Sequence, residues 1–216
     1  ILADFANHIE VLGWSQGKLV RLWYATIENT ITRKQTIFHP GAEPVRDIDG
    51  DGRPEIVVSV FGLEGDRRWH VYAYEAMTGK RLWDLPDQYL SGMADVDGDG
   101  VFELCCTGTA GPLVPAASEL SVVSFKGRKQ ARRWQAADAA FATHDLPDWP
   151  LHVNSCAATG RCTLLAGHIP GRRGAIFFTR RNLDVSTGQT ELVAWGSEPG
   201  GKIEQLGRMV GPRLEA

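Results

Sequence analysis

Short apolar runs recur along the chain, and turn-forming residues separate them. "EIVVSVF" and "WHVYAYE" are followed by a turn and by "GKRLWDL", a closing segment with a tryptophan. The same order returns further on with "ELCCTG", "SELSVVSF" and "RKQARRWQA". Short runs rich in β-branched and aromatic residues predict β-strands, so each unit should be a small meander of about four strands.

The units recur at intervals of 43 to 50 residues when Asp4, Asp47, Asp95 and Asp145 are aligned. A period of this size is typical of propeller blades or solenoid turns. The approximate units are residues 1–42, 43–90, 91–140 and 141–200, with 201–216 opening a further one. The predicted class is all-β, because only the Ala-rich "ARRWQAADAAFATH" has a composition that suits a helix.

An acidic loop precedes the first strand of each central unit. "DIDGDGRPE" and "DVDGDGVFE" place three aspartates at alternate positions, with glycines between them and a glutamate at position 9. Calcium takes six to eight oxygen ligands, and clustered carboxylates repel one another without a cation. We therefore predict two calcium sites. Their ligands are Asp47, Asp49, Asp51, the carbonyl of Arg53 and Glu55 in one, and Asp95, Asp97, Asp99, the carbonyl of Val101 and Glu103 in the other.

Two alternatives compete with this interpretation. An EF-hand shares the alternating aspartates but needs a glutamate at position 12 and a helix afterwards. Position 12 here is Val58 or Cys106 and a strand follows, which disfavours an EF-hand. A pair of solvated Asp-Gly turns is the second alternative, although two loops in phase with the repeat are hard to obtain from turn chemistry alone.

The two central loops resemble the calcium loops of FG-GAP or VCBS repeats, the blades of integrin alpha-subunit-like β-propellers. The resemblance implies a propeller of seven or eight blades, of which this chain would form about four. It also implies a secreted or cell-surface location. The outer units depart from the motif at Asp4 and Asp145 and are expected to bind no metal.

Two functions are compatible with these loops. The first is a calcium-stabilised scaffold for recognition or adhesion that binds a protein or a polysaccharide without catalysis. The alternative is the propeller portion of a polysaccharide-active enzyme of the rhamnogalacturonan-lyase type, whose calcium-bearing propellers have similar loops. No catalytic residue is predicted, because the sequence shows no recognisable Ser-His-Asp, Cys-His or paired-carboxylate set.

Aromatic and histidine residues supply the weaker candidates. Four tryptophans close successive units and should pack between them: Trp23, Trp83, Trp134 and Trp195. The candidate ligand contacts are residues outside that pattern or beside acidic loop residues: Trp69, Trp149, His144 and His152.

Composition and cysteine content narrow the function classes. A net charge of −3 and a pI near 6.1 give no reason to expect a nucleic-acid partner. No apolar run reaches the roughly 18 to 20 residues of a membrane span, and we expect the chain, which begins at Ile1, to be a mature or excised piece.

The four cysteines fall into two pairs. Cys156 and Cys162 flank a turn and are a candidate disulfide. Cys105 and Cys106 are adjacent on a predicted strand, so they should point to opposite faces and remain unbridged.

Overall fold

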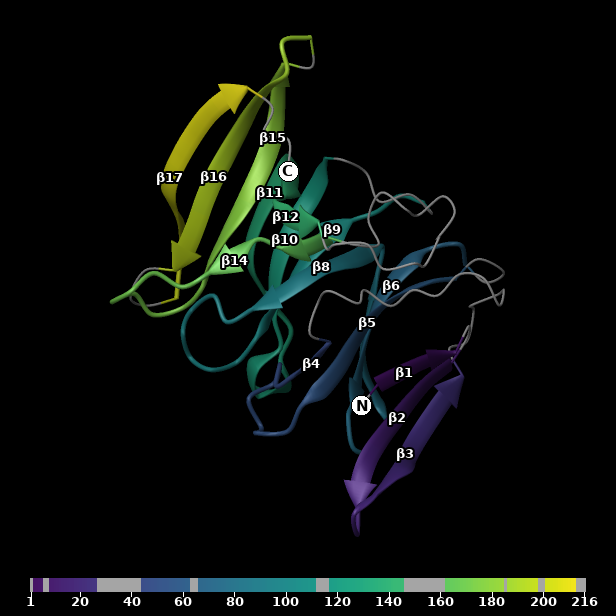
Figure 1. The fold of residues 1–216 in the computed structure, drawn as a ribbon. Helices are drawn as coiled ribbons and strands as arrows, with labels where there is room; N and C mark the ends of the chain where they lie inside the picture. Colours follow the sequence, from purple (N-terminus) through teal and green to yellow (C-terminus); the bar gives the residue numbers. More distant parts are fainter. Residues whose placement is uncertain are drawn as a thin grey trace.

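The computed structural model describes residues 2–5, 8–26, 44–62, 66–111, 117–145, 162–184, 186–197 and 201–212. Their regular secondary structure is β-strand, apart from one 3-10 turn, η1 (Lys126–Arg128), as Figure 1 shows. The predicted all-β class is therefore confirmed. None of the helical structure in these ranges is long and apolar enough to cross a lipid bilayer.

The first half of the chain forms two antiparallel sheets. The three-stranded sheet contains β1 (Leu2–Phe5), β2 (His8–Ser15) and β3 (Lys18–Thr26). The four-stranded sheet contains β4 (Val45–Arg46), β5 (Glu55–Phe61), β6 (Trp69–Glu75) and β7 (Arg81–Pro86).

The second half forms a larger sheet with the order β17-β16-β15-β11-β10-β9-β8, with β14 beside β15. Its earlier strands are β8 (Gln88–Ala94), β9 (Glu103–Gly108), β10 (Ser118–Ser124) and β11 (Ala131–Phe141). Its later strands are β14 (Ala166–Gly167), β15 (Ile176–Asp184), β16 (Gln189–Ser197) and β17 (Ile203–Pro212). A separate ribbon pairs β12 (Thr143–Asp145) with β13 (Cys162–Leu164).

The described strands do not form the separate blades that a propeller fold would have. In a propeller each blade is a sheet of its own. Here Ala140 and Phe141 at the end of β11 pair with Arg180 and Thr179 of β15, which joins strands of the third and fourth predicted units into one open sheet. The reason is the length of β11, whose last pair with β10 is at Ala139, so its final residues have backbone groups left for a new partner.

The Ala-rich segment is also a strand, although its composition suits a helix. Trp134 pairs with Val122 of β10, and Ala139 and Phe141 are buried. Pairing with β10 and burial against the core thus override helix propensity, which is a weak prior.

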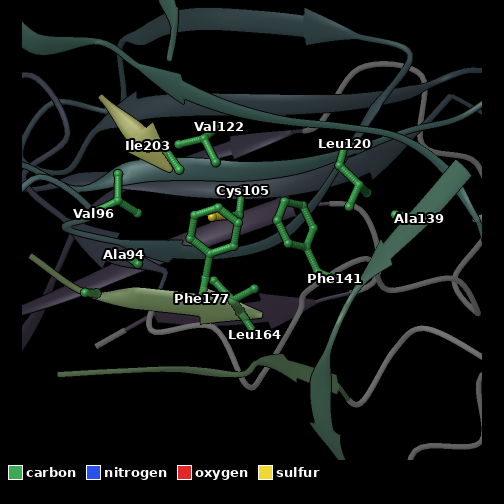
Figure 2. Packing of buried hydrophobic residues seen from close by; sticks show 11 residues of the cluster. Ala94, Val96, Cys105, Leu120, Val122, Ala139, Phe141, Leu164, Phe177 and Ile203 are labelled. Carbon is green, nitrogen blue, oxygen red and sulfur yellow. The ribbon is translucent and has the colours of Figure 1, made fainter. Parts of the chain in front are cut away.

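Two buried clusters lie on the two faces of β9. Cys105 belongs to one, with Phe141, Phe177 and Leu164, and Figure 2 shows the two phenylalanine rings lying among these side chains. Cys106 belongs to the other, with Phe125. Both cysteines are free and buried, which confirms the prediction that they are unbridged packing residues on opposite faces.

The four recurrent tryptophans pack against the buried clusters, as predicted. Trp134 contacts Trp195 with ring centroids 5.0 Å apart, and Trp83 lies 4.5 Å from Phe125. The indole nitrogen of Trp23 donates to the carbonyl of Ala76 at 2.7 Å, which ties the first sheet to the second.

Candidate metal centre

Each acidic loop is an eight-residue connection between two paired strands. Arg46 pairs with Glu55 around loop 47–54, and Ala94 pairs with Glu103 around loop 95–102. The glycines adopt positive φ angles, as at Gly50 (79°) and Gly98 (74°), which side chains other than glycine rarely adopt. The Asp-Gly alternation therefore produces a tight curl that turns the carboxylates inward.

The first loop brings Asp47, Asp49 and Glu55 together, with one oxygen of each within 4.8 Å of the others. The two oxygens of Asp47 accept hydrogen bonds from the backbone N–H groups of Gly50 at 2.7 Å and Gly52 at 2.9 Å. Glu55 accepts one from the N–H of Ile48 at 2.9 Å. The backbone thus holds these carboxylates in one place against their mutual repulsion.

The second loop gathers Asp95, Asp97 and Asp99, whose oxygens also lie within 4.8 Å of one another, so a third aspartate takes the part that Glu55 has in the first cluster. Asp95 accepts hydrogen bonds from the N–H groups of Gly98 at 2.7 Å and Gly100 at 3.0 Å. Glu103 accepts one from Val96 at 2.9 Å, the counterpart of the Glu55 contact.

The glutamates are the most deeply placed acids of the two loops. Glu55 is 1% exposed and Glu103 is fully buried. Burial raises the pKa of Glu55 to about 7 and that of Glu103 to about 8, and neighbouring aspartates add to both shifts. Among the described residues, Oε1 of Glu103 and Oδ1 of Asp97 are buried without a hydrogen-bond partner.

This donor set fits a hard divalent cation. Buried unpaired carboxylate oxygens are costly, and a cation that they coordinate removes that cost. Carboxylate and carbonyl oxygens are the ligands that such ions prefer. When bound, the ion would offset part of the negative charge of the loop and cross-link two strand ends.

Basic side chains near the loops were missed in the sequence. Arg128 donates to Asp49 and to Asp51, each at 2.9 Å, and Lys126 donates to Asp99. Arg133 donates to Asp97 at 2.9 Å. The only signal in the sequence is the basic character of "KGRKQARR", which by itself does not indicate what it contacts.

A third loop of the same length occupies the corresponding place before β15. Gly167 pairs with Ile176 around residues 168–175, "HIPGRRGA", which hold no carboxylate. The repeat spacing predicted this position at Asp145 instead. Asp145 and Asp4 lie within strands, paired with Cys162 and Ile9, so neither belongs to a loop of this kind.

The remaining candidate residues are spread over the chain. Trp69 is 2% exposed and packs against Phe61 and Tyr89, a core position rather than a binding surface. His144 lies in β12, paired with Thr163. Trp149, His152 and Cys156 fall outside the described residues, so their predicted roles and the Cys156–Cys162 disulfide stay predictions.

A histidine that the sequence did not single out sits between two carboxylates. Nδ1 of His70 lies 2.7 Å from Asp84, and Nε2 lies 2.8 Å from Asp66. Burial opposes the charge of His70, but the hydrogen bonds to Asp84 and Asp66 outweigh it and raise its pKa. The group therefore clamps β6 to β7 and to the preceding turn.

A pocket of about 290 Å³ lies between β11 and the strands β15 to β17. Arg181 and Arg208 at its wall both donate to Glu191, whose side chain is 7% exposed. The buried carboxylate is thus paired within the pocket.

Comparisons with known proteins gave matches in structure only. No protein-family model matches the chain. No curated protein matches it in sequence. Among solved structures, rhamnogalacturonan lyase YesW matches with 14% identity and a TM-score of 0.47 over 90% of this chain. The exotype rhamnogalacturonan lyase YesX matches with 18% identity and a TM-score of 0.46 over 95%.

A third match is the Bacillus licheniformis rhamnogalacturonan lyase PL11, with 18% identity and a TM-score of 0.45 over 96% of this chain. The chain spans 41 to 43% of the length of these three lyases.

The predicted assignment to the FG-GAP or VCBS propeller family is wrong. The described sheets are open, and β11 and β15 join strands of two predicted units into one sheet, whereas each blade of a propeller is a sheet of its own. The loop motif led to the assignment because it specifies a local turn with carboxylates. A local turn can be carried by more than one arrangement of sheets.

The raised pKa values predict how the metal-free protein depends on pH. Glu55 and Glu103 have a higher pKa in the folded protein than the value of about 4.5 in the unfolded chain. Such a group contributes fully to stability below its unfolded pKa, and the contribution is lost as pH rises through its folded pKa. In excess chelator, the urea midpoint of the wild type should therefore fall between about pH 5 and pH 8.

The matched variant for this experiment is Glu55→Gln combined with Glu103→Gln, which removes both titrating groups. Its midpoint should fall less over the same range, and the His70 contribution is common to both proteins and cancels in the difference. Equal slopes for the two proteins would contradict the raised pKa values.

Proposed function

We propose that this chain is a calcium-binding, all-β part of a polysaccharide-active protein similar to the rhamnogalacturonan lyases. The observation that carries the proposal is the pair of acidic loops. Each gathers three carboxylates within 4.8 Å, and each includes or adjoins a buried glutamate. The Asp-Gly motif of these loops is also the feature that relates the sequence to rhamnogalacturonan lyases.

Calcium is proposed over magnesium because of the donor set. Calcium accepts six to eight oxygens in flexible geometry, whereas magnesium needs near-ideal octahedral geometry and gives up its waters reluctantly. The predicted ligand set of each site is four side-chain carboxylates and a backbone carbonyl, and three of the carboxylates in each set lie within 4.8 Å of one another. Such a loop suits the larger and less demanding ion.

The polysaccharide role rests on the acidic loops, whose motif resembles the calcium loops of rhamnogalacturonan lyases. An extracytoplasmic location would suit both roles, because calcium modules outside cells work at about 10⁻⁴ to 10⁻³ M calcium.

Affinity electrophoresis in gels that contain rhamnogalacturonan tests the polysaccharide role. The calcium-loaded chain should be retarded, and the chelated chain or Asp49→Ala combined with Asp97→Ala should be retarded less. Gels that contain a neutral galactan serve as the control for charge. Lyase activity would appear as ultraviolet absorbance from the unsaturated uronate that elimination leaves on the product.

The outcomes separate the functions. Retardation without product supports a recognition scaffold, and retardation with product supports a lyase. A chain that takes up calcium but interacts with no polysaccharide would overturn the polysaccharide role and leave the calcium role standing.

A further inference from the structure

One peptide group connects the two acidic loops. The N–H of Phe102 donates to the carbonyl oxygen of Asp47 at 3.0 Å. The carbonyl of the same peptide group belongs to Val101 and is the predicted backbone ligand of the second loop. The first loop therefore holds the N–H of a peptide group whose carbonyl oxygen is a predicted ligand of the second site.

The turn η1 provides a second connection. The N–H of Gly127 donates to the carbonyl of Asp49 at 2.8 Å, and Arg128 reaches the Asp49 carboxylate. Lys126, two residues earlier, donates to Asp99 of the second loop. Three consecutive residues thus contact both loops.

The loops also lie in van der Waals contact. A Cβ atom added at Gly50 would lie 3.0 Å from Cγ2 of Val101. A shift of one loop therefore has to be accommodated by the other, because packed protein deforms little.

Resting on the proposed calcium binding, we propose that the two cation sites are coupled, so that calcium in either loop raises the affinity of the other. A cation in the first loop fixes the backbone of Asp47 and Asp49. That backbone positions the Val101–Phe102 peptide group and η1. Calcium binding at the second site then has a smaller entropic cost, because these ligand-bearing segments are already ordered. By linkage the effect is reciprocal.

The coupling should end at the second loop. The N–H of Ala175 donates to the carbonyl of Asp95 at 2.7 Å, which repeats the same contact between the second and third loops. The third loop, residues 168–175, has no carboxylate to bind a cation. Two calcium ions, and not three, should therefore bind in one cooperative unit.

Calorimetric titration with calcium tests the coupling. The titration of the wild type measures the product of its two calcium association constants. Asp49→Ala and Asp97→Ala each give the constant of the site that remains. The wild-type product should exceed the product of the two single-site constants by roughly tenfold, within the usual range of allosteric coupling.

A second set of variants addresses the connection itself. Lys126→Gln combined with Arg128→Gln should strengthen each separate site, because it removes competing positive charge. It should also lower the coupling factor without abolishing it, because the side-chain contacts are lost while the backbone contacts of Asp47 and Asp49 remain. Lys129→Gln, the exposed neighbour, is the matched control and should leave the coupling factor unchanged.

The two proposals fail in different ways. A wild type that takes up no calcium overturns the proposed function. A wild type that binds two calcium ions, with a product equal to that of the single-site variants, overturns the coupling alone.

Discussion

Calcium should raise the melting temperature of the chelated protein by roughly 10 to 20 °C. A ligand that binds only the folded state at 100 times its dissociation constant stabilises it by about 2.7 kcal/mol per site, so two sites contribute about 5 kcal/mol. For a chain of this length, about 1 kcal/mol corresponds to a shift of roughly 2 to 4 °C. At the second site, the ion would coordinate the oxygens of Glu103 and Asp97 that are otherwise buried without a partner. At the first site, it would separate three carboxylates that lie within 4.8 Å of one another.

Differential scanning calorimetry of the chelated protein, with calcium or magnesium added back, measures this shift. Magnesium should give a much smaller shift at the same concentration, since it demands tighter geometry. The combined variant Asp49→Ala and Asp97→Ala should show no shift with calcium. A wild-type melting temperature that does not change with calcium at any concentration would contradict the proposed metal centre.

Loss of one aspartate from either loop should reduce the calcium stoichiometry from two to one. Asp49 is 2% exposed and lies with Asp47 and Glu55, and Asp97 lies with Asp95 and Asp99. Alanine at either position removes a ligand oxygen from a set that has little redundancy.

Three substitutions outside the loops are the controls for stoichiometry. Asp4→Ala and Asp145→Ala change acids of the outer units, which lie in strands. Asp138→Asn removes an exposed charge from β11 and keeps a residue that tolerates its positive φ. All three should still take up two calcium ions. Two ions bound by both Asp49→Ala and Asp97→Ala would remove these aspartates from the ligand set.

Sequence reasoning was accurate where the information is local. The alternation of acids and glycines depends on residues within nine positions of one another, and the structure gathers most of these carboxylates. The opposite orientations of Cys105 and Cys106 follow from the two-residue period of a strand. The packing of the recurrent tryptophans follows from the repeat.

Sequence reasoning failed where distant segments choose their partners. The Ala-rich segment became β11 because β10 and β15 were available to pair with it. Trp69 lies outside the recurrent tryptophan pattern, yet it lies in the core, where it pairs with Phe61 of the adjacent strand β5. Asp145 suited the repeat period, but strand pairing placed the corresponding loop at residues 168–175.

The sequence by itself determined the strand content and the two acidic curls, since short-range sterics, glycine conformations and side-chain periodicity set both. Only the tertiary structure decided how the sheets join, and only it placed Lys126, Arg128 and Arg133 beside the aspartates. Arg128 is 79 residues from Asp49. Contacts over such separations depend on backbone pairing and burial throughout the fold, and no local pattern in the chain specifies them.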